Sequence, residues 1–449
     1  MDRPETRFTF NGDAALAYQI LGDGPADLLY LQGFMSNLEL NWDHPAMARF
    51  LHGLARSRRL IVTDYRGLGC SERGTPHEVP ALESMMDDLI AVLEVAGSER
   101  AVILATRECC FVACLFAATY PDRTAGLVLY EAAANWLWSE ETPWEWTEDR
   151  FEEDHEWFRN RWGTRAGAIE YVDAFAPTMA GDPNYIDWSL RYMLLSLAPG
   201  AAVATSRKYM YTDIRPILPS IHVPVLILER PLLHEEYGAS TRYVADHIPG
   251  ASLVELPGAD SPLWLGDQAS VLQAVDAFHG ELRREERELE RVLTTVLFTD
   301  IVGSTEKAAD LGDRAWRGLV ARHHATVRAF LERYRGTEVD TAGDGFFATF
   351  DGPARAVRCA QAIGDAVRSL GIEIRSGCHT GEIELEGDGV RGIAVHIGAR
   401  VAALAEPSRI LVSSTVKDLV AGSGLAFEDA GEHELKGVPD RWHLYRAVK

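Results

Sequence analysis

The chain has 449 residues, of which 47% are hydrophobic and 25% charged, and this composition excludes a disordered or fibrous protein. Acidic residues outnumber basic ones by 67 to 44, and the net charge of −23 argues against nucleic acid and anionic lipid as partners. At about 100–200 residues per domain, this length predicts two or three domains. The longest apolar run, Cys109–Tyr120, is too short to span a bilayer, and no secretion signal is recognised, so we expect a cytoplasmic protein.

The first part of the chain alternates short apolar runs with helical periodicity, which is typical of buried parallel strands joined by helices. The expected strands are Leu28–Leu31, Leu60–Thr63, Ala101–Ala105, Gly126–Tyr130, Pro224–Leu228 and Ser252–Leu256. Helices are expected over Ala81–Val95 and near Val271–Phe278. The alternation predicts a doubly wound α/β domain over residues 1–279.

Residues 135–219 interrupt this alternation and contain seven of the eleven tryptophans. A helical lid inserted at the carboxyl edge of the sheet would explain such a segment. Its aromatic side chains either pack small helices onto the sheet or line a ligand pocket, and both interpretations stay open. Beyond this domain, the charged run 280–291 predicts a short helical linker, and a second α/β pattern occupies residues 292–449.

Several strings of the first domain resemble the α/β-hydrolase fold, among them LLYLQGF at 28–34 and ILATRECC at 103–110. In that family Arg107 would stand at the nucleophile position and Ser261 at the position of the histidine base. The acid position falls near Leu233, with Glu235 and Glu236 close enough to leave the alignment open. Because a guanidinium cannot act as a nucleophile, we expect no ester hydrolysis.

Two cysteines follow that position, and Cys109 and Cys110 are expected to be buried and structural because no histidine is placed to activate them. The domain would then bind an unknown small ligand or a partner beneath the lid and regulate the second domain. The alternative is that it gives structural support alone, and the sequence does not choose between these two roles.

The second domain opens with a strand, Val292–Asp300, that ends in a carboxylate. The small residues that open the following helix, and whose backbone N–H groups suit phosphate oxygens, are Gly303, Ser304 and Thr305. Farther along the chain, Asp344 lies at the tip of a predicted hairpin. Carboxylates are ligands that Mg²⁺ prefers, so Asp300 and Asp344 together predict a cation site.

The pair of strings FTDIVGST at 298–305 and TAGDGFFATF at 341–350 resembles the catalytic domain of class III adenylate and guanylate cyclases. The resemblance extends over residues 292–449 and includes GIAVHIGARVAALAEPSRILVSSTV at 392–416. It implies a ferredoxin-like catalytic domain. The joint architecture resembles actinobacterial multidomain cyclases that carry an N-terminal α/β-hydrolase domain.

The resemblance also implies a reaction. Asp300, Asp344 and the carbonyl of Ile301 would hold two Mg²⁺ or Mn²⁺ ions per site, and the ribose 3′-oxygen would attack the α-phosphorus as pyrophosphate leaves. Arg400 matches the arginine that stabilises the transition state in the family, and His396 lies one helical turn before it. In this family, the aspartates and the arginine come from different chains, which implies a homodimer.

Three further residues bear on the nucleotide. Lys436 is a candidate triphosphate contact. Adenylate cyclases of this class usually recognise adenine with a lysine and an aspartate, but Asp340 occupies the lysine position and Gly389, next to Asp388, the aspartate position. A carboxylate at 340 can accept from adenine N6 or from guanine N1 and N2. ATP is the expected substrate, with GTP or a non-catalytic nucleotide-binding regulator as the alternatives.

Overall fold

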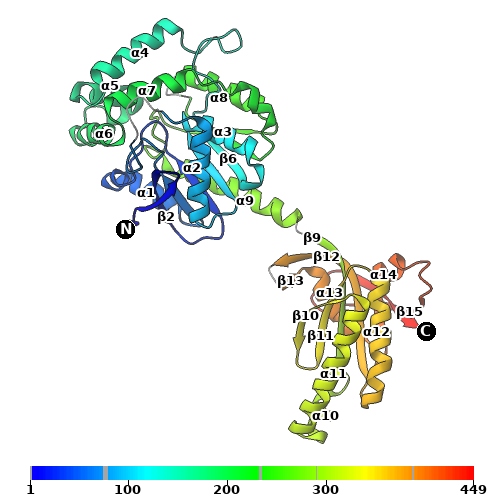
Figure 1. Ribbon diagram of the computed structural model, residues 1–449. Coiled ribbons are helices and arrows are strands. Elements are labelled where there is room, and N and C mark those ends of the chain that lie inside the picture. The colour runs from blue at the N-terminus through cyan, green and yellow to red at the C-terminus, as the bar shows by residue number, and fades with distance from the viewer. Residues whose placement is uncertain (1–2, 74–78, 232–234, 290, 387–388, 449) are drawn as a thin grey trace. The chain divides into compact units, whose positions relative to one another are not determined.

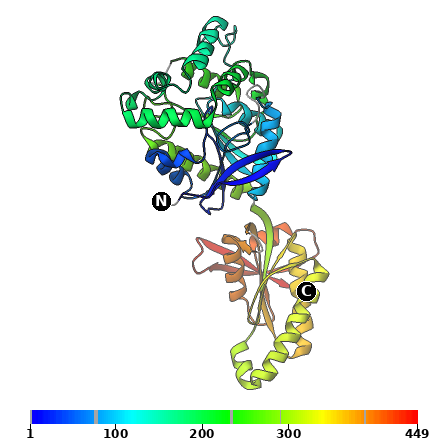
Figure 2. The ribbon, with the colours of Figure 1, turned by 60° about the vertical axis from the view of Figure 1, so that its left-hand side comes forward.

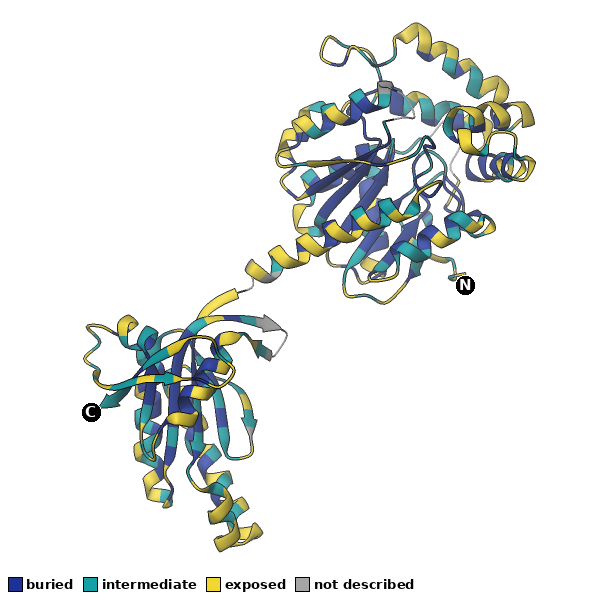
Figure 3. Ribbon diagram, turned by 180° about the vertical axis from the view of Figure 1, so that it is seen from behind, coloured by how far each residue is buried: buried dark blue, intermediate teal, exposed yellow. Residues whose placement is uncertain are grey.

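The structure is a computed structural model that describes residues 3–73, 79–231, 235–289, 291–386 and 389–448. The chain divides into two compact units, Met1–Leu282 and Arg283–Lys449 (Figure 1). Within the described residues, no helix has both the length and the apolar character needed to cross a bilayer. Each unit has its own sheet and its own buried core, which Figure 3 shows as dark strands under more exposed helices.

The first unit is built on a sheet of eight strands in the order β1-β2-β4-β3-β5-β6-β7-β8. The strands are β1 (Arg7–Asn11), β2 (Ala14–Leu21), β3 (Asp27–Leu31), β4 (Arg59–Thr63), β5 (Ala101–Thr106), β6 (Thr124–Tyr130), β7 (Val225–Glu229) and β8 (Ser252–Glu255). All pairs from β4 to β8 are parallel, which confirms the predicted α/β sheet. The antiparallel strands β1 and β2 were not predicted, since β2 is rich in alanine, a residue depleted in strands.

The helices of the first unit form two groups. One group packs near the sheet, and the other forms the insertion between β6 and β7. The helices near the sheet are α1 (Pro45–Leu54), α2 (Leu82–Val95), α3 (Cys109–Thr119), α8 (Glu235–His247) and α9 (Gln268–Leu289). The helices of the insertion are α4 (Glu148–Arg161), α5 (Arg165–Phe175), α6 (Pro183–Ser196) and α7 (Pro199–Met210), which gather beyond one edge of the sheet (Figure 1). Short 3₁₀ turns lie at Leu40–Asp43, Pro121–Arg123, Pro177–Met179 and Arg215–Ser220. The insertion therefore has the helical character expected for residues 135–219.

One helix differs from the prediction. The sequence predicts a helix near Val271–Phe278 and a separate linker helix over 280–291, but α9 is continuous from Gln268 to Leu289. Its buried stripe continues from Phe278 to Leu282 at helical spacing. Gly280 alone does not end it, because one glycine costs a helix only about 1 kcal/mol.

The second unit has a sheet in the order β10-β11-β9-β12-β14-β16-β15, with β13 paired to β12. The strands are β9 (Arg291–Ile301), β10 (Thr337–Ala342), β11 (Gly345–Phe350), β12 (Ile374–Glu386), β13 (Gly389–Arg391), β14 (Ile410–Ser413), β15 (Ala426–Glu434) and β16 (Arg441–Val448). The helices are α10 (Ser304–Leu311), α11 (Asp313–Tyr334), α12 (Pro353–Val367), the 3₁₀ turn Arg368–Leu370, α13 (Ile393–Leu404) and α14 (Ser414–Leu419). This mixed α/β architecture is the one that the resemblance implied.

The central strand β9 separates two layers of helices, which Figure 2 shows on opposite faces of the sheet. Leu297 and Ile301 belong to the core that contains residues of α11 and α12. Val296 and Phe298 point to the other face and pack against α13. Because side chains alternate along a strand, Asp300 lies on the same face as Phe298.

Candidate functional site

The two predicted metal ligands lie next to each other. Asp300 is the second-last residue of β9, and Asp344 lies in the turn between β10 and β11, which pairs with β9. The backbone N–H of Ile301 donates to Asp344 Oδ2 at 3.2 Å. Burial, followed by the negative charge of Asp300, raises the pKa of Asp344, and a hydrogen bond with Ser304 opposes this rise. The two negative charges repel each other, and a cation bound between them would remove this repulsion.

A cation of the chain itself lies beside Asp300. Arg375 stands opposite Asp300 in the register of β12 and β9, with its Nη2 2.6 Å and its Nε 3.1 Å from Asp300 Oδ2. Arg375 was not among the site residues predicted from the sequence, because only the pairing of β12 with β9 places this arginine opposite Asp300.

The donor set suits a hard divalent cation. The described residues hold no group of three or more His, Cys, Asp and Glu side chains arranged around one point. A cation held by Asp300, Asp344 and the carbonyl of Ile301 would therefore need further oxygens to complete its coordination shell. Mg²⁺ is usually bound in this manner, by one or two carboxylates with waters and substrate phosphates.

A cavity of about 650 Å³ adjoins this site. Asp300, Asp340 and Arg375 lie in its wall together with small residues of α13. The rings of Phe298 and Phe347, which also line the cavity, stack with their centroids 4.5 Å apart and their planes 5° from parallel. The cavity thus combines apolar ring surface with two carboxylates and one guanidinium, a lining that suits a flat base and charged phosphates.

Two residues assigned to the reaction lie elsewhere in this unit. His396 and Arg400 are exposed on α13, one turn apart, and neither lines the cavity. The residues of α13 that do line it include Ala399, Ala402 and Ala403. Lys436 is exposed in the turn after β15 and is also absent from the cavity wall. None of these three side chains therefore lines the cavity that Asp300 lines.

The predicted phosphate-binding turn is adjacent to the aspartates. Gly303 has a φ of +67°, a left-handed conformation that residues with a side chain rarely adopt, and it directs the chain into α10 at Ser304. Thr305 follows in the first turn of this helix. At the predicted base-binding position, Gly389 begins β13 and pairs with Glu386 of β12, whereas Asp388 lies outside the described residues.

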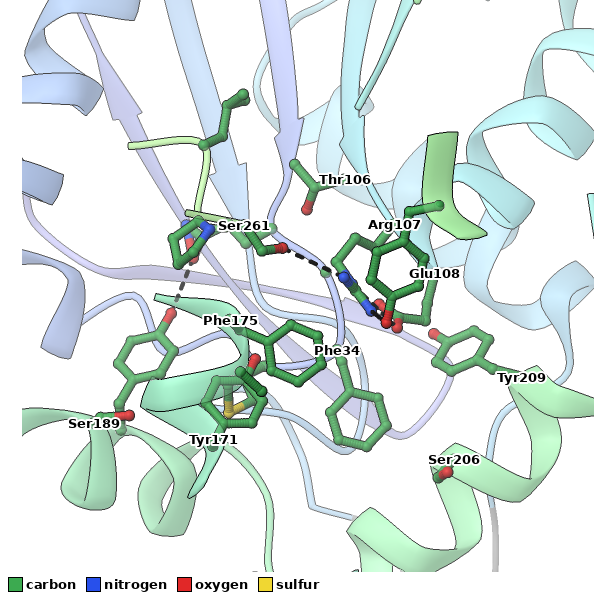
Figure 4. A pocket seen from close by; sticks show the side chains of 18 of the residues that line it. Phe34, Thr106, Arg107, Glu108, Tyr171, Phe175, Ser189, Ser206, Tyr209 and Ser261 are labelled. Atoms are coloured by element: carbon green, nitrogen blue, oxygen red, sulfur yellow. Dashed lines mark hydrogen bonds and ion pairs between the residues drawn. The ribbon is translucent and has the colours of Figure 1, made fainter. Parts of the chain in front are cut away.

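In the first unit, Arg107 and Ser261, which the resemblance places at the nucleophile and base positions, lie in contact. Arg107 lies in the sharp turn between β5 and α3 with a φ of +50°, and its Nη1 donates to Ser261 Oγ at 3.3 Å (Figure 4). Leu233 lies outside the described residues. The carboxylate that the structure places here is Glu131, directly after β6, whose Oε2 lies 3.3 Å from Arg107 Nη1 and accepts from Ser261 Oγ at 2.8 Å. Glu131 was not predicted as a site residue, because the family pattern places the acid after β7 and Glu131 follows β6.

Aromatic rings surround the Arg107 guanidinium. Its carbon lies 4.7 Å from the ring centroid of Tyr237, 5.0 Å from that of Phe175 and 5.9 Å from that of Trp136. These residues line a cavity of about 390 Å³ whose wall includes side chains of α4, α5, α6 and α7 (Figure 4). The aromatic residues of the insertion therefore line a pocket as well as packing its helices.

The cysteines that follow Arg107 are buried, as predicted. Cys109 and Cys110 are inaccessible to solvent. Burial raises the pKa of the Cys109 thiol to about 12, so the thiolate is scarce near neutral pH.

Comparison with known proteins gives separate results for the two units. Residues 288–446 match the model of the adenylate and guanylate cyclase catalytic domain. A predicted adenylate cyclase of Rhizobium meliloti (strain 1021) is 26% identical over 166 residues, which cover 35% of this chain and 28% of that protein. A receptor-type adenylate cyclase of Trypanosoma brucei brucei is 25% identical over 203 residues, 34% of this chain and 16% of that protein. The chain thus matches less than a third of the length of these relatives.

The first unit is similar in fold to solved α/β hydrolases. The match to the enol-lactonase of Burkholderia xenovorans LB400 covers 61% of this chain and 100% of the enol-lactonase chain, with a TM-score of 0.50 and 20% identity. A thermophilic esterase from Thermogutta terrifontis covers 62% of this chain and 99% of its own, with a TM-score of 0.50 and 24% identity. At these identities the likeness concerns the fold alone.

Proposed function

We propose that this chain converts ATP into 3′,5′-cyclic AMP and pyrophosphate, because residues 288–446 match the model of the adenylate and guanylate cyclase catalytic domain. One observation carries the proposal. The carboxylates of Asp300 and Asp344 are adjacent, and the chain enters helix α10 shortly after Asp300. Asp300 also lines the cavity that contains the stacked rings of Phe298 and Phe347. This combination can hold cations, triphosphate and base at one place.

Each part of the site has a task in this reaction. Asp300, Asp344 and the Ile301 carbonyl would hold two Mg²⁺ or Mn²⁺ ions, which when bound acidify the ribose 3′-hydroxyl and offset triphosphate charge. The backbone N–H groups of Ser304 and Thr305 at the start of α10 would donate to phosphate oxygens. The α-phosphate oxygens gain charge as the 3′-oxygen attacks and pyrophosphate leaves, and a guanidinium that donates to them stabilises this state.

We propose that this guanidinium is Arg400 of a second chain, with His396 beside it. Both are exposed on α13 and lie outside the cavity of their own chain. A two-fold arrangement would place α13 of each protomer against the aspartates of its partner and form two equivalent sites. Lys436, exposed after β15, would reach the triphosphate in the same assembly.

The experiment is complementation between inactive chains. Asp300→Ala and Arg400→Ala should each abolish activity as homodimers. When they are mixed and exchanged freely, half of the dimers are mixed, each with one intact site, so about a quarter of the wild-type activity should return. Asp300→Ala mixed with Asp344→Ala is the matched control, because both changes damage the same half-site and no rescue should occur. Absence of rescue in the first mixture contradicts the shared site.

A second candidate substrate is GTP, and Asp340 favours it. Its exposed carboxylate lines the cavity and can accept from both N1–H and the N2 amine of guanine. Assay of the purified chain with each nucleotide and Mn²⁺ decides between them, and the proposal expects a higher kcat/KM for ATP. Cyclic product from either nucleotide excludes a non-catalytic nucleotide-binding regulator.

For the first unit we propose a ligand-binding, regulatory role without ester hydrolysis. Arg107 fills the nucleophile position and is tied to Ser261 and Glu131 by hydrogen bonds. No p-nitrophenyl ester should therefore be turned over. Turnover that disappears on substitution of Cys109 or Cys110 would contradict this role.

A further inference from the structure

We propose that the 390 Å³ cavity of the first unit binds an organic cation with apolar substituents, such as a quaternary or tertiary amine. The inference rests on the proposed function in one respect only, that this unit binds a ligand and does not hydrolyse one. The volume lies in the range of small-molecule sites. Half of the lining residues are Phe, Tyr or Trp, and the faces of such rings attract cations.

The cavity already contains one positive charge, the guanidinium of Arg107, in contact with aromatic rings. The Arg107 guanidinium carbon lies within 6 Å of the ring centroids of Trp136, Phe175 and Tyr237. The positive charge of Arg107 is balanced by the carboxylate of Glu131, whose Oε2 is 3.3 Å from Arg107 Nη1. Arg107 is thus part of a neutral pair and does not make the cavity a site for anions.

Among the described residues, the remaining charges of the wall are negative and belong to Glu108, Asp154 and Glu170. Glu170 is exposed, has its Oε1 3.6 Å from Arg161 Nε and accepts from Trp157 Nε1 at 2.6 Å. Glu108 has its Oε1 3.6 Å from Arg107 Nε, while its Oε2 is buried without a hydrogen-bond partner among the described residues. Among the described lining residues, acidic side chains therefore outnumber basic ones, which disfavours an anionic ligand.

Asp154 provides the specific counter-charge. It lies on α4 three and four residues before Trp157 and Phe158, so the carboxylate and the two rings share one face of the helix and line the same cavity. The structure gives Asp154 no hydrogen bond or ion pair within the described residues, and burial raises its pKa to about 6 although the positive charges of Arg150 and Arg107 oppose the rise. An unpaired carboxylate among rings is costly, and an ammonium group between Asp154 and these rings would offset that cost.

The test is direct binding to the purified full-length chain, without nucleotide. Benzyltrimethylammonium, neutral benzyl alcohol and anionic benzoate are titrated separately, with calorimetry and tryptophan fluorescence as readouts. The cation should bind at least tenfold more tightly than benzoate. Asp154→Asn should weaken binding of the cation about tenfold and leave binding of benzyl alcohol unchanged.

Asp149→Asn is the matched control, because Asp149 is exposed on the same helix and absent from the cavity wall. It should bind all three probes as the wild type does, and thermal unfolding of both variants checks that they fold. Benzoate binding as tight as the cation, an unchanged affinity in Asp154→Asn, or no binding of the cation at millimolar concentration would each overturn the proposal. None of these outcomes touches the cyclase proposal, since no turnover is measured.

Discussion

The guanidinium of Arg375 and the carboxylate of Asp300 lie 2.6 Å apart across neighbouring strands of one sheet. The register of β9 and β12 sets them opposite each other. In this arrangement Arg375 neutralises one of the two carboxylates that would hold a divalent cation. If Asp300 holds a divalent cation as proposed, this guanidinium would compete with the cation for Asp300 Oδ2 and would weaken metal binding.

We therefore expect Arg375→Gln to raise the apparent affinity for Mn²⁺. Both side chains are more than a third exposed, so solvent weakens the pair and the gain should be only several-fold. Stabilisation of the protein against heat as a function of Mn²⁺ concentration measures it. Arg409→Gln, at an exposed arginine outside the cavity, is the control and should leave the affinity unchanged. Weaker Mn²⁺ binding in Arg375→Gln would show that the arginine supports the metal site instead.

Removing Arg107 should destabilise the first unit. Glu131 would be left as a buried carboxylate without its cation, and breaking a buried pair in this way costs about 3–5 kcal/mol. Arg107→Met should show this loss, and the double variant Arg107→Met with Glu131→Gln should recover a large part of it. Urea unfolding followed by tryptophan fluorescence measures both.

The fluorescence signal reports mainly on this unit, because every tryptophan except Trp316 and Trp442 lies in it. Glu131→Gln alone completes the double-mutant cycle. If the double variant is less stable than Arg107→Met, the buried Glu131 carboxylate does not need the charge of Arg107 to stabilise it.

Gly377→Ala should lower cyclase activity through α13. A Cβ at Gly377 would lie 2.2 Å from the backbone nitrogen of Ala402, so α13 must move away from β12. Since α13 carries Arg400, a shift of about 1 Å can cost on the order of 100-fold in rate. Gly364→Ala in α12 is the control, because nothing lies within 4 Å of its Cβ position. Steady-state kinetics of both variants measure the effect, and full activity of Gly377→Ala would place Arg400 outside the reaction.

The second unit should lose stability as the pH falls below about 6.5. Burial lowers the pKa of His379 from 6.5 to about 4, so the folded chain binds this proton more weakly than the unfolded chain. The contribution of neutral His379 is complete above pH 6.5 and is lost as the pH falls toward 4. Chemical unfolding at several pH values between 7.5 and 5, with the loss of cyclase activity as the readout, should show this dependence. His379→Gln should reduce the slope, and an equal slope in the variant would assign the dependence to other groups.

Much of the site was predictable because its residues stand in local patterns. Asp300 ends an apolar strand and Asp344 lies in a glycine-bounded turn, and spacing of this kind depends on neighbours in the chain. The place of Arg107 between a strand and an apolar helix was also predictable, because both elements are local patterns.

The partners of these residues were not predictable in the same way. Arg375 is 75 residues from Asp300, and Glu131 is 130 residues from Ser261. Which residues stand opposite each other depends on strand register, and which side chains share a cavity depends on how helices and sheet pack. Such contacts join distant segments through burial and pairing over the whole domain. For that reason local periodicity indicated the elements and the acidic pair, whereas the counter-charges around Asp300 and Arg107 emerged only from the folded chain.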